Sequence, residues 1–146
     1  MIDDTLVRET LMRAGWVPGR RDEARANEWA HQLDSPGGLQ IFDAARAALA
    51  EFGGLKVDVV GPGIDFAKTS FELDPLLAIG EEDRFEDAAS QLARRVYPLG
   101  DVGGGHAFLA IDDRGAVYFI NESGPTLLGH TIENALAALI QGRNKV

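Results

Sequence analysis

Apolar residues recur at helical spacing through the first third of the chain. This spacing predicts three helices: one that begins near Asp3 or Asp4 and ends at Gly15, one from about Asp22, and one over about 39–51. Their apolar stripes are Leu6, Val7, Leu11 and Ala14; Ala26, Trp29, Ala30 and Leu33; and Ile41, Ala44, Ala45, Ala48, Leu49 and Phe52. The segment 35–38 separates the second helix from the third, and Gly53 follows the third as a terminating glycine.

The period changes to two after Gly53, which predicts strands. Leu55, Val57 and Val59 alternate with polar residues, as do Phe71 and Leu73, and Ile64 and Phe66 are expected to extend one of these strands. Each strand is expected to have one solvent-exposed face, because polar residues occupy the alternate positions. The segment 61–63 supplies a turn between them.

The second half contains a helix, a hairpin and a final helix. Helical spacing returns over about 81–95, and two apolar runs at 107–111 and 116–120 are joined by a four-residue turn that ends in Gly115. Thr131 is expected to begin the last helix and Gly142 to end it. This order predicts an α+β fold in one domain over 1–146. Its mainly antiparallel sheet would be packed by N-terminal helices, a middle helix and a C-terminal helix.

Composition narrows the class of protein. The chain has no cysteine, which excludes disulfides, thiolate metal sites and cysteine nucleophiles. No apolar run is long enough to span a membrane, and the N-terminus does not resemble a signal peptide, so a cytoplasmic location is expected. The net charge of −9 is spread along the chain and would repel nucleic acid and anionic membranes. A basic protein partner is favoured instead.

Residues suited to catalysis are present but poorly arranged. His31, His106 and His130 are far apart in sequence and lack metal-ligand spacing. The glycine-rich segment 101–106 lacks the lysine and the following helix of a phosphate-binding loop, so it is interpreted as a flexible entry to the hairpin. Asp112 and Asp113 are typical turn formers. We therefore expect no catalytic residue, cofactor or metal.

Two groups of residues are candidates for protein binding. Five carboxylates stand within seven residues at the start of the helix expected over 81–95: Glu81, Glu82, Asp83, Glu86 and Asp87. They could attract a basic surface and speed its encounter, or they could form a solvated helix end stabilised by the helix dipole. Trp16, in the turn with Arg20, could be an interface anchor or a core residue, whereas Trp29 is expected in the core.

Short segments in a fixed order resemble one family, the third branch of the SUKH superfamily of bacterial immunity proteins. They are Ala14 to Arg20; Glu51 to Leu55; Tyr97 to Gly100; Leu109 to Asp112 with Gly115 to Tyr118; Leu128 with Gly129; and Ala135 to Gly142. The resemblance covers about residues 10–142. It implies a single α+β domain that binds and neutralises a cognate polymorphic toxin, such as a nuclease or deaminase, in the cell that makes it.

The resemblance implies a toxin-binding protein and supplies no catalytic residues. Its partner would be the toxin domain, and binding residues vary with the toxin. A general interaction or regulatory module would show the same sequence features, and a large toxin gene beside this one would distinguish the two. Neither the sequence nor the resemblance indicates an oligomeric state.

Overall fold

The computed structural model describes residues 2–33 and 39–143, and its centre is a six-stranded antiparallel sheet in the order β1–β2–β3–β4–β5–β6. The strands are β1 (Lys56–Val57), β2 (Phe71–Glu72), β3 (Val96–Val102), β4 (Ala107–Asp112), β5 (Val117–Asn121) and β6 (Gly124–Gly129). The helices are α1 (Thr5–Arg13), α2 (Glu23–Leu33), α3 (Asp43–Phe52), the 3-10 helix η1 (Pro75–Ala78), α4 (Glu82–Leu92) and α5 (Ile132–Gln141). The expected α+β fold is confirmed.

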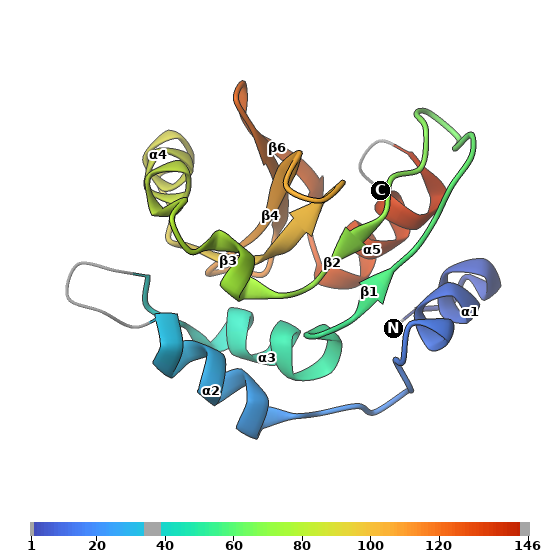
Figure 1. Cartoon of the computed structure of the whole chain (residues 1–146), viewed down its shortest axis with the longest axis horizontal. Helices are drawn as coiled ribbons and strands as arrows, with labels where there is room; N and C mark the ends of the chain where they lie inside the picture. Colours follow the sequence, from blue (N-terminus) through green and yellow to red (C-terminus); the bar gives the residue numbers. More distant parts are fainter. Residues whose placement is uncertain (1, 34–38, 144–146) are drawn as a thin grey trace.

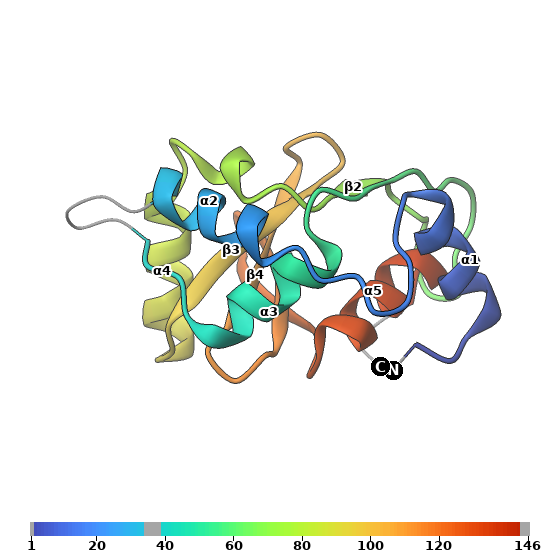
Figure 2. The same cartoon turned by 90° about the horizontal axis from the view of Figure 1, so that it is seen from below.

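Helices cover both faces of the sheet. On one face, α3 packs on β3 and β4 and α5 packs on β5 and β6, with α2 outside α3 and α1 beside α5 (Figures 1 and 2). On the opposite face, α4 packs against β3 and β6 (Figure 1). We call these the α3/α5 face and the α4 face. No helix within the described ranges is long and apolar enough to cross a membrane.

The two faces carry cores of different size. Strand alternation sends Leu109 and Ile111 of β4 into the large core of the α3/α5 face, which also holds most buried residues of the helices. Phe108 and Ala110 point into a small core beneath α4, where the Phe108 and Phe85 rings meet edge-on at 5.8 Å. The middle of the sheet is therefore buried on both sides.

Helix ends follow the capping residues expected from the sequence. The Asp4 carboxylate accepts a hydrogen bond from the Val7 amide at 3.0 Å, and the Thr131 hydroxyl accepts one from the Asn134 amide at 3.1 Å. Gly142 ends α5 in the left-handed conformation, with φ of 63°. The first and last helices are thus confirmed almost to the residue, although Leu6 is exposed rather than on the buried stripe.

Two helix boundaries were predicted wrongly. α3 begins at Asp43, four residues later than expected, because the chain up to Phe42 is extended. α4 ends at Leu92 instead of about Arg95, because Ala93 adopts the left-handed conformation and turns the chain into β3. The break expected at 35–38 lies outside the described residues.

Two strands, β3 and β6, were missed. β3 contains Pro98 and Gly100, two residue types that are uncommon inside a strand, and a bulge lies between them. Close packing requires glycine at position 100, because a Cβ there would collide with the Glu72 carbonyl group of β2. Ile64 and Phe66 do not extend a strand and instead lie in the long connection between β1 and β2.

Candidate partner-binding surface

The acidic run lies at the start of α4, where the structure brings all five of its carboxylates together. Phe85 and Ala88 anchor the helix in the small core, so the remaining positions of these two turns face outward. Asp83, Glu86 and Asp87 are exposed, and Glu81 and Glu82 are half-buried. Negative charge in the first turn of the helix is favourable to the helix dipole, which accounts for Glu82 and Asp83. Glu86 and Asp87 lie in the second turn, where exposure to solvent lets their charges coexist.

Most of this negative charge has no internal partner. Glu81 pairs with Arg84 at 3.1 Å, and the Glu82 carboxylate accepts a hydrogen bond from the Gly80 amide at 3.2 Å. Within the part of the chain that the structure describes, Asp83, Glu86 and Asp87 form no ion pair. These three carboxylates are therefore available to a basic surface. We call the five carboxylates the α4 acidic end.

Apolar side chains adjoin the α4 acidic end. Leu77 in η1 and Ile79 directly after it are 36% and 61% exposed, and only Gly80 and Glu81 separate them from the helix. Protein interfaces typically combine apolar contact area with complementary charge. This segment offers both in a continuous stretch of chain from residue 77 to residue 87.

Trp16 and Arg20 lie on the α3/α5 face, away from the α4 acidic end. Trp16 is 4% exposed, stacks on Phe52 with ring centroids 6.1 Å apart, and donates from Nε1 to the Glu51 carboxylate at 3.2 Å. Arg20 donates to the Glu51 and Gly53 carbonyl oxygens at 2.7 and 2.8 Å. Both side chains hold the end of α3 in place, as the core alternative expects. A binding role for either stays a prediction.

Glycine at position 53 completes this arrangement. A Cβ there would collide with the Trp29 ring and the Leu49 carbonyl oxygen. Trp29 is buried against it, as expected from the sequence, and carries the Arg25 guanidinium over its outer surface at 4.6 Å. The conformation of Gly53 itself is extended, so the glycine serves close packing rather than a left-handed cap.

A second acidic group, which no local sequence pattern indicates, lies on β2, on β3 and just after β2. Glu72 of β2 is paired with Asp101 of β3, and Asp74 follows two residues after Glu72. Burial, then the charges of Glu72 and Asp74, raise the pKa of Asp101. Asp101 was interpreted as the start of a flexible loop, but it belongs to a buried strand. We call these three carboxylates the β2–β3 acidic group.

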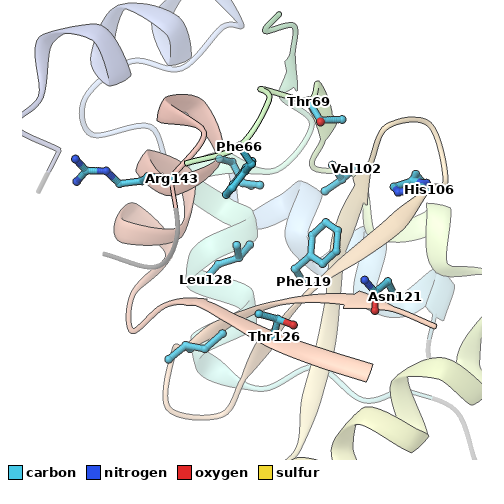
Figure 3. A pocket seen from close by; sticks show the side chains of 11 residues that line it. Phe66, Thr69, Val102, His106, Phe119, Asn121, Thr126, Leu128 and Arg143 are labelled. Carbon is cyan, nitrogen blue, oxygen red and sulfur yellow. The ribbon is translucent and has the colours of Figure 1, made fainter. Parts of the chain in front are cut away.

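An apolar hollow of about 350 Å³ opens on the α3/α5 face beyond the end of α5 (Figure 3). Phe119, Val102 and Leu128 form its floor, with His106 and Arg143 at the rim (Figure 3). His106 belongs to the turn between β3 and β4, in which three successive glycines have positive φ. The segment expected to be a flexible entry to the hairpin is thus a glycine-rich turn that borders a hollow.

The other residues weighed for catalysis have structural roles or lie apart. Asp112 forms the hairpin turn, accepting from the Arg114 and Ala116 amides at 2.8 and 3.0 Å and from the Tyr118 hydroxyl at 2.9 Å. No three histidine or carboxylate side chains in 2–33 and 39–143 are placed to hold a metal ion.

Comparison with known proteins gives one match. The model of the family described as SUKH-3 immunity protein matches residues 4–142, which is nearly the whole chain. No curated protein and no solved structure matches it.

Proposed function

The chain belongs to the SUKH-3 immunity protein family, and from this premise we propose that it neutralises a polymorphic toxin whose active domain is a nuclease or a deaminase. Immunity proteins of this family act against toxins and are generally not enzymes. The proposal adds the chemistry of the toxin and the surface that meets it. It also places the encounter in the cytoplasm of the producing cell, where nucleic-acid substrates are found.

The unpaired carboxylates of the α4 acidic end carry this proposal. A domain that acts on nucleic acid needs a basic groove for the phosphate backbone. Asp83, Glu86 and Asp87 present negative charge that is not neutralised within the described chain, on a molecule with a net charge of −9. Complementary charge raises the rate and specificity of association. An acidic surface that covers the groove would block substrate access without any chemistry of its own.

The apolar residues beside the acidic end strengthen the fit. A stable interface buries about 1,200–2,000 Å² in total, and its centre is usually apolar. Leu77 and Ile79 supply exposed apolar surface next to the carboxylates. Contact through these residues would exclude water from nearby charge pairs and thereby slow dissociation.

Co-expression with the toxin tests this function directly. We expect the chain to protect cells from its cognate toxin domain, to be sought among the genes beside its own, and the purified proteins to form a stable complex. The purified chain should inhibit DNA or RNA cleavage, or base deamination, by the toxin in vitro. Variants that no longer inhibit this activity should also fail to protect cells. Recovery of partners without any toxin domain, together with no protection, would contradict the proposal and favour a general interaction module.

A further inference from the structure

A row of paired residues crosses the α4 face of the sheet. Glu72 of β2 lies opposite Asp101 of β3, and Asp101 lies opposite Phe108 of β4. Cross-strand partners project to the same side of a sheet. Phe108 belongs to the small core beneath α4, so Asp101 and Glu72 face the same side as α4.

Asp101 is nearly buried and yet unpartnered. It is 8% exposed, and no group in the described chain donates a hydrogen bond or forms an ion pair with its carboxylate. Arg84, whose guanidinium lies 5.7 Å from the Phe108 ring, pairs with Glu81 instead. The Asp101 carboxylate oxygens are not fully enclosed, so a side chain from outside the chain can reach them. A charge in so covered a position is nevertheless solvated less well than a free carboxylate, which costs stability.

The neighbours of Asp101 increase this penalty. Glu72 and Asp74 are also negative, and both oppose ionisation of Asp101. One Asp74 oxygen is already engaged, since it accepts a hydrogen bond from the Leu76 amide at 2.9 Å. A metal ion is a poor candidate, because no trio of carboxylates or histidines among the described residues has metal-binding geometry. A long, flexible cationic side chain does not need such a compact ligand set.

We propose that the β2–β3 acidic group receives a lysine or arginine side chain of the toxin partner. The proposal rests on the proposed function and extends its surface. The group is joined to the α4 acidic end by residues 75–80, which include the exposed Leu77 and Ile79. A single basic partner could therefore contact both acidic groups with the apolar segment between them.

Binding would reverse the electrostatic penalty at Asp101. In the free chain the carboxylate is surrounded by like charge, whereas in the complex a cation beside it would favour ionisation. Removing one partner of a buried charge pair mainly accelerates dissociation, whereas removing a rim charge mainly slows association. The two acidic groups should therefore differ in the rate constant that they control.

The test compares Asp101→Asn with Asp113→Asn, which neutralises an exposed aspartate on the hairpin turn. The probe is the toxin domain that the protection experiment identifies, and its affinity is measured by surface plasmon resonance. We expect Asp101→Asn to weaken binding by about tenfold or more, mostly through faster dissociation, without lowering the melting temperature. Asp113→Asn should change affinity less than twofold. Glu72→Gln, a second variant, should weaken binding several-fold.

Side-chain carboxyl NMR gives a readout that a purely structural role would not change. The pKa of Asp101 should fall when the toxin domain binds. Three results would each overturn the inference while the proposed function stands. They are an unchanged affinity of Asp101→Asn, a loss of folding stability in Asp101→Asn as large as its loss of binding free energy, and an unchanged Asp101 pKa in the complex. Binding of Mg²⁺ or Ca²⁺ at this group in the free chain would also overturn it. If the unaltered chain forms no complex with the toxin domain, both the inference and the proposed function are overturned.

Discussion

Two buried aspartates on adjacent strands differ in the hydrogen-bond and ion-pair partners that surround their carboxylates. Asp112, at the end of β4, is 1% exposed and its two oxygens receive two backbone amides, the Tyr118 hydroxyl and the Arg94 guanidinium. Asp101, in β3, is 8% exposed, receives none of these and lies near the negative charges of Glu72 and Asp74. The first carboxylate is fully compensated by its neighbours, whereas the described residues 2–33 and 39–143 supply no such partner to the second.

Asp112 therefore stabilises the fold, whereas the contacts within the fold give no reason for a carboxylate at position 101. Asp112 organises a hairpin turn and ties β4 to Arg94, which lies just before β3. Asp101 does nothing comparable for stability. A destabilising charge is expected where a residue acts on a partner, because function is often obtained at the expense of stability.

The largest expected effect on stability comes from changing Asp112, the aspartate whose charge is compensated. Asp112→Ala should lower the free energy of unfolding by about 3 kcal/mol, because it leaves two turn amides, Tyr118 and Arg94 without their shared acceptor. Urea unfolding at pH 7 measures this. Asp113→Ala is the matched control and should lose less than about 0.5 kcal/mol, since its contact with Arg94 is 3.9 Å and exposed. Equal losses would remove the distinction between the neighbouring aspartates.

Removing the cation should have a smaller effect than removing the carboxylate. Arg94→Met keeps the apolar stem but leaves Asp112 without its ion pair, and we expect a loss of about 2 kcal/mol. Asp112 would still hold three hydrogen bonds. The double variant Arg94→Met/Asp112→Ala should be less destabilised than the sum of the single changes. Simple additivity would show that the pair is not coupled.

Tyr118→Phe should lower stability by about 1 kcal/mol at pH 7, because Asp112 loses one donor. Burial, then the hydrogen bond to Asp112 and the Asp112 charge, raise the pKa of Tyr118 above its ordinary value of 10.0. The stability from this shift is therefore present below pH 10 and lost as pH rises through the folded pKa. Unfolding measured from pH 8 to 12 should show this decline in the unaltered chain and a flatter curve in Tyr118→Phe.

The smallest expected effect has the opposite sign. Asp101→Asn should raise the free energy of unfolding at pH 7 by roughly 0.5 kcal/mol, since it removes an uncompensated charge. The pKa of Asp101 is raised in the folded state, so the stability linked to its proton is present below about pH 3.8 and lost as pH increases. The advantage of the variant should therefore shrink on acidification. A loss of stability at pH 7 would show that Asp101 has a partner in the fold.

The sequence predicted the parts of the fold that have strong local signals. The hairpin formed by β4 and β5, the capped helices α1 and α5, and the buried stripe of α2 were all expected. β3 was missed, because Pro98 and Gly100 are turn-forming residues in isolation. Only the close approach of β2 and the bulge make them compatible with a central strand.

The candidate surface was predictable only where it is local in sequence. The α4 acidic end is a continuous run, so its residues could be named from composition and spacing. The β2–β3 acidic group joins residues about 30 positions apart through strand pairing, and no periodic pattern reveals such a contact. A buried position for Trp16 likewise depends on Phe52 and Glu51, which only the folded chain brings near.

The central claim is that the acidic α4 face, rather than acidity in general, meets the toxin. Its most direct test is the association rate constant with the toxin domain as a function of ionic strength. The triple variant Asp83→Asn/Glu86→Gln/Asp87→Asn is compared with Asp3→Asn/Glu9→Gln/Glu28→Gln, an equal charge change at exposed positions in and before the helices of the other face. We expect the first variant to associate about tenfold more slowly at low salt, with a flatter salt dependence, and the second to stay close to the unaltered chain. Equal slowing by the two variants, or none by the first, would contradict the central claim.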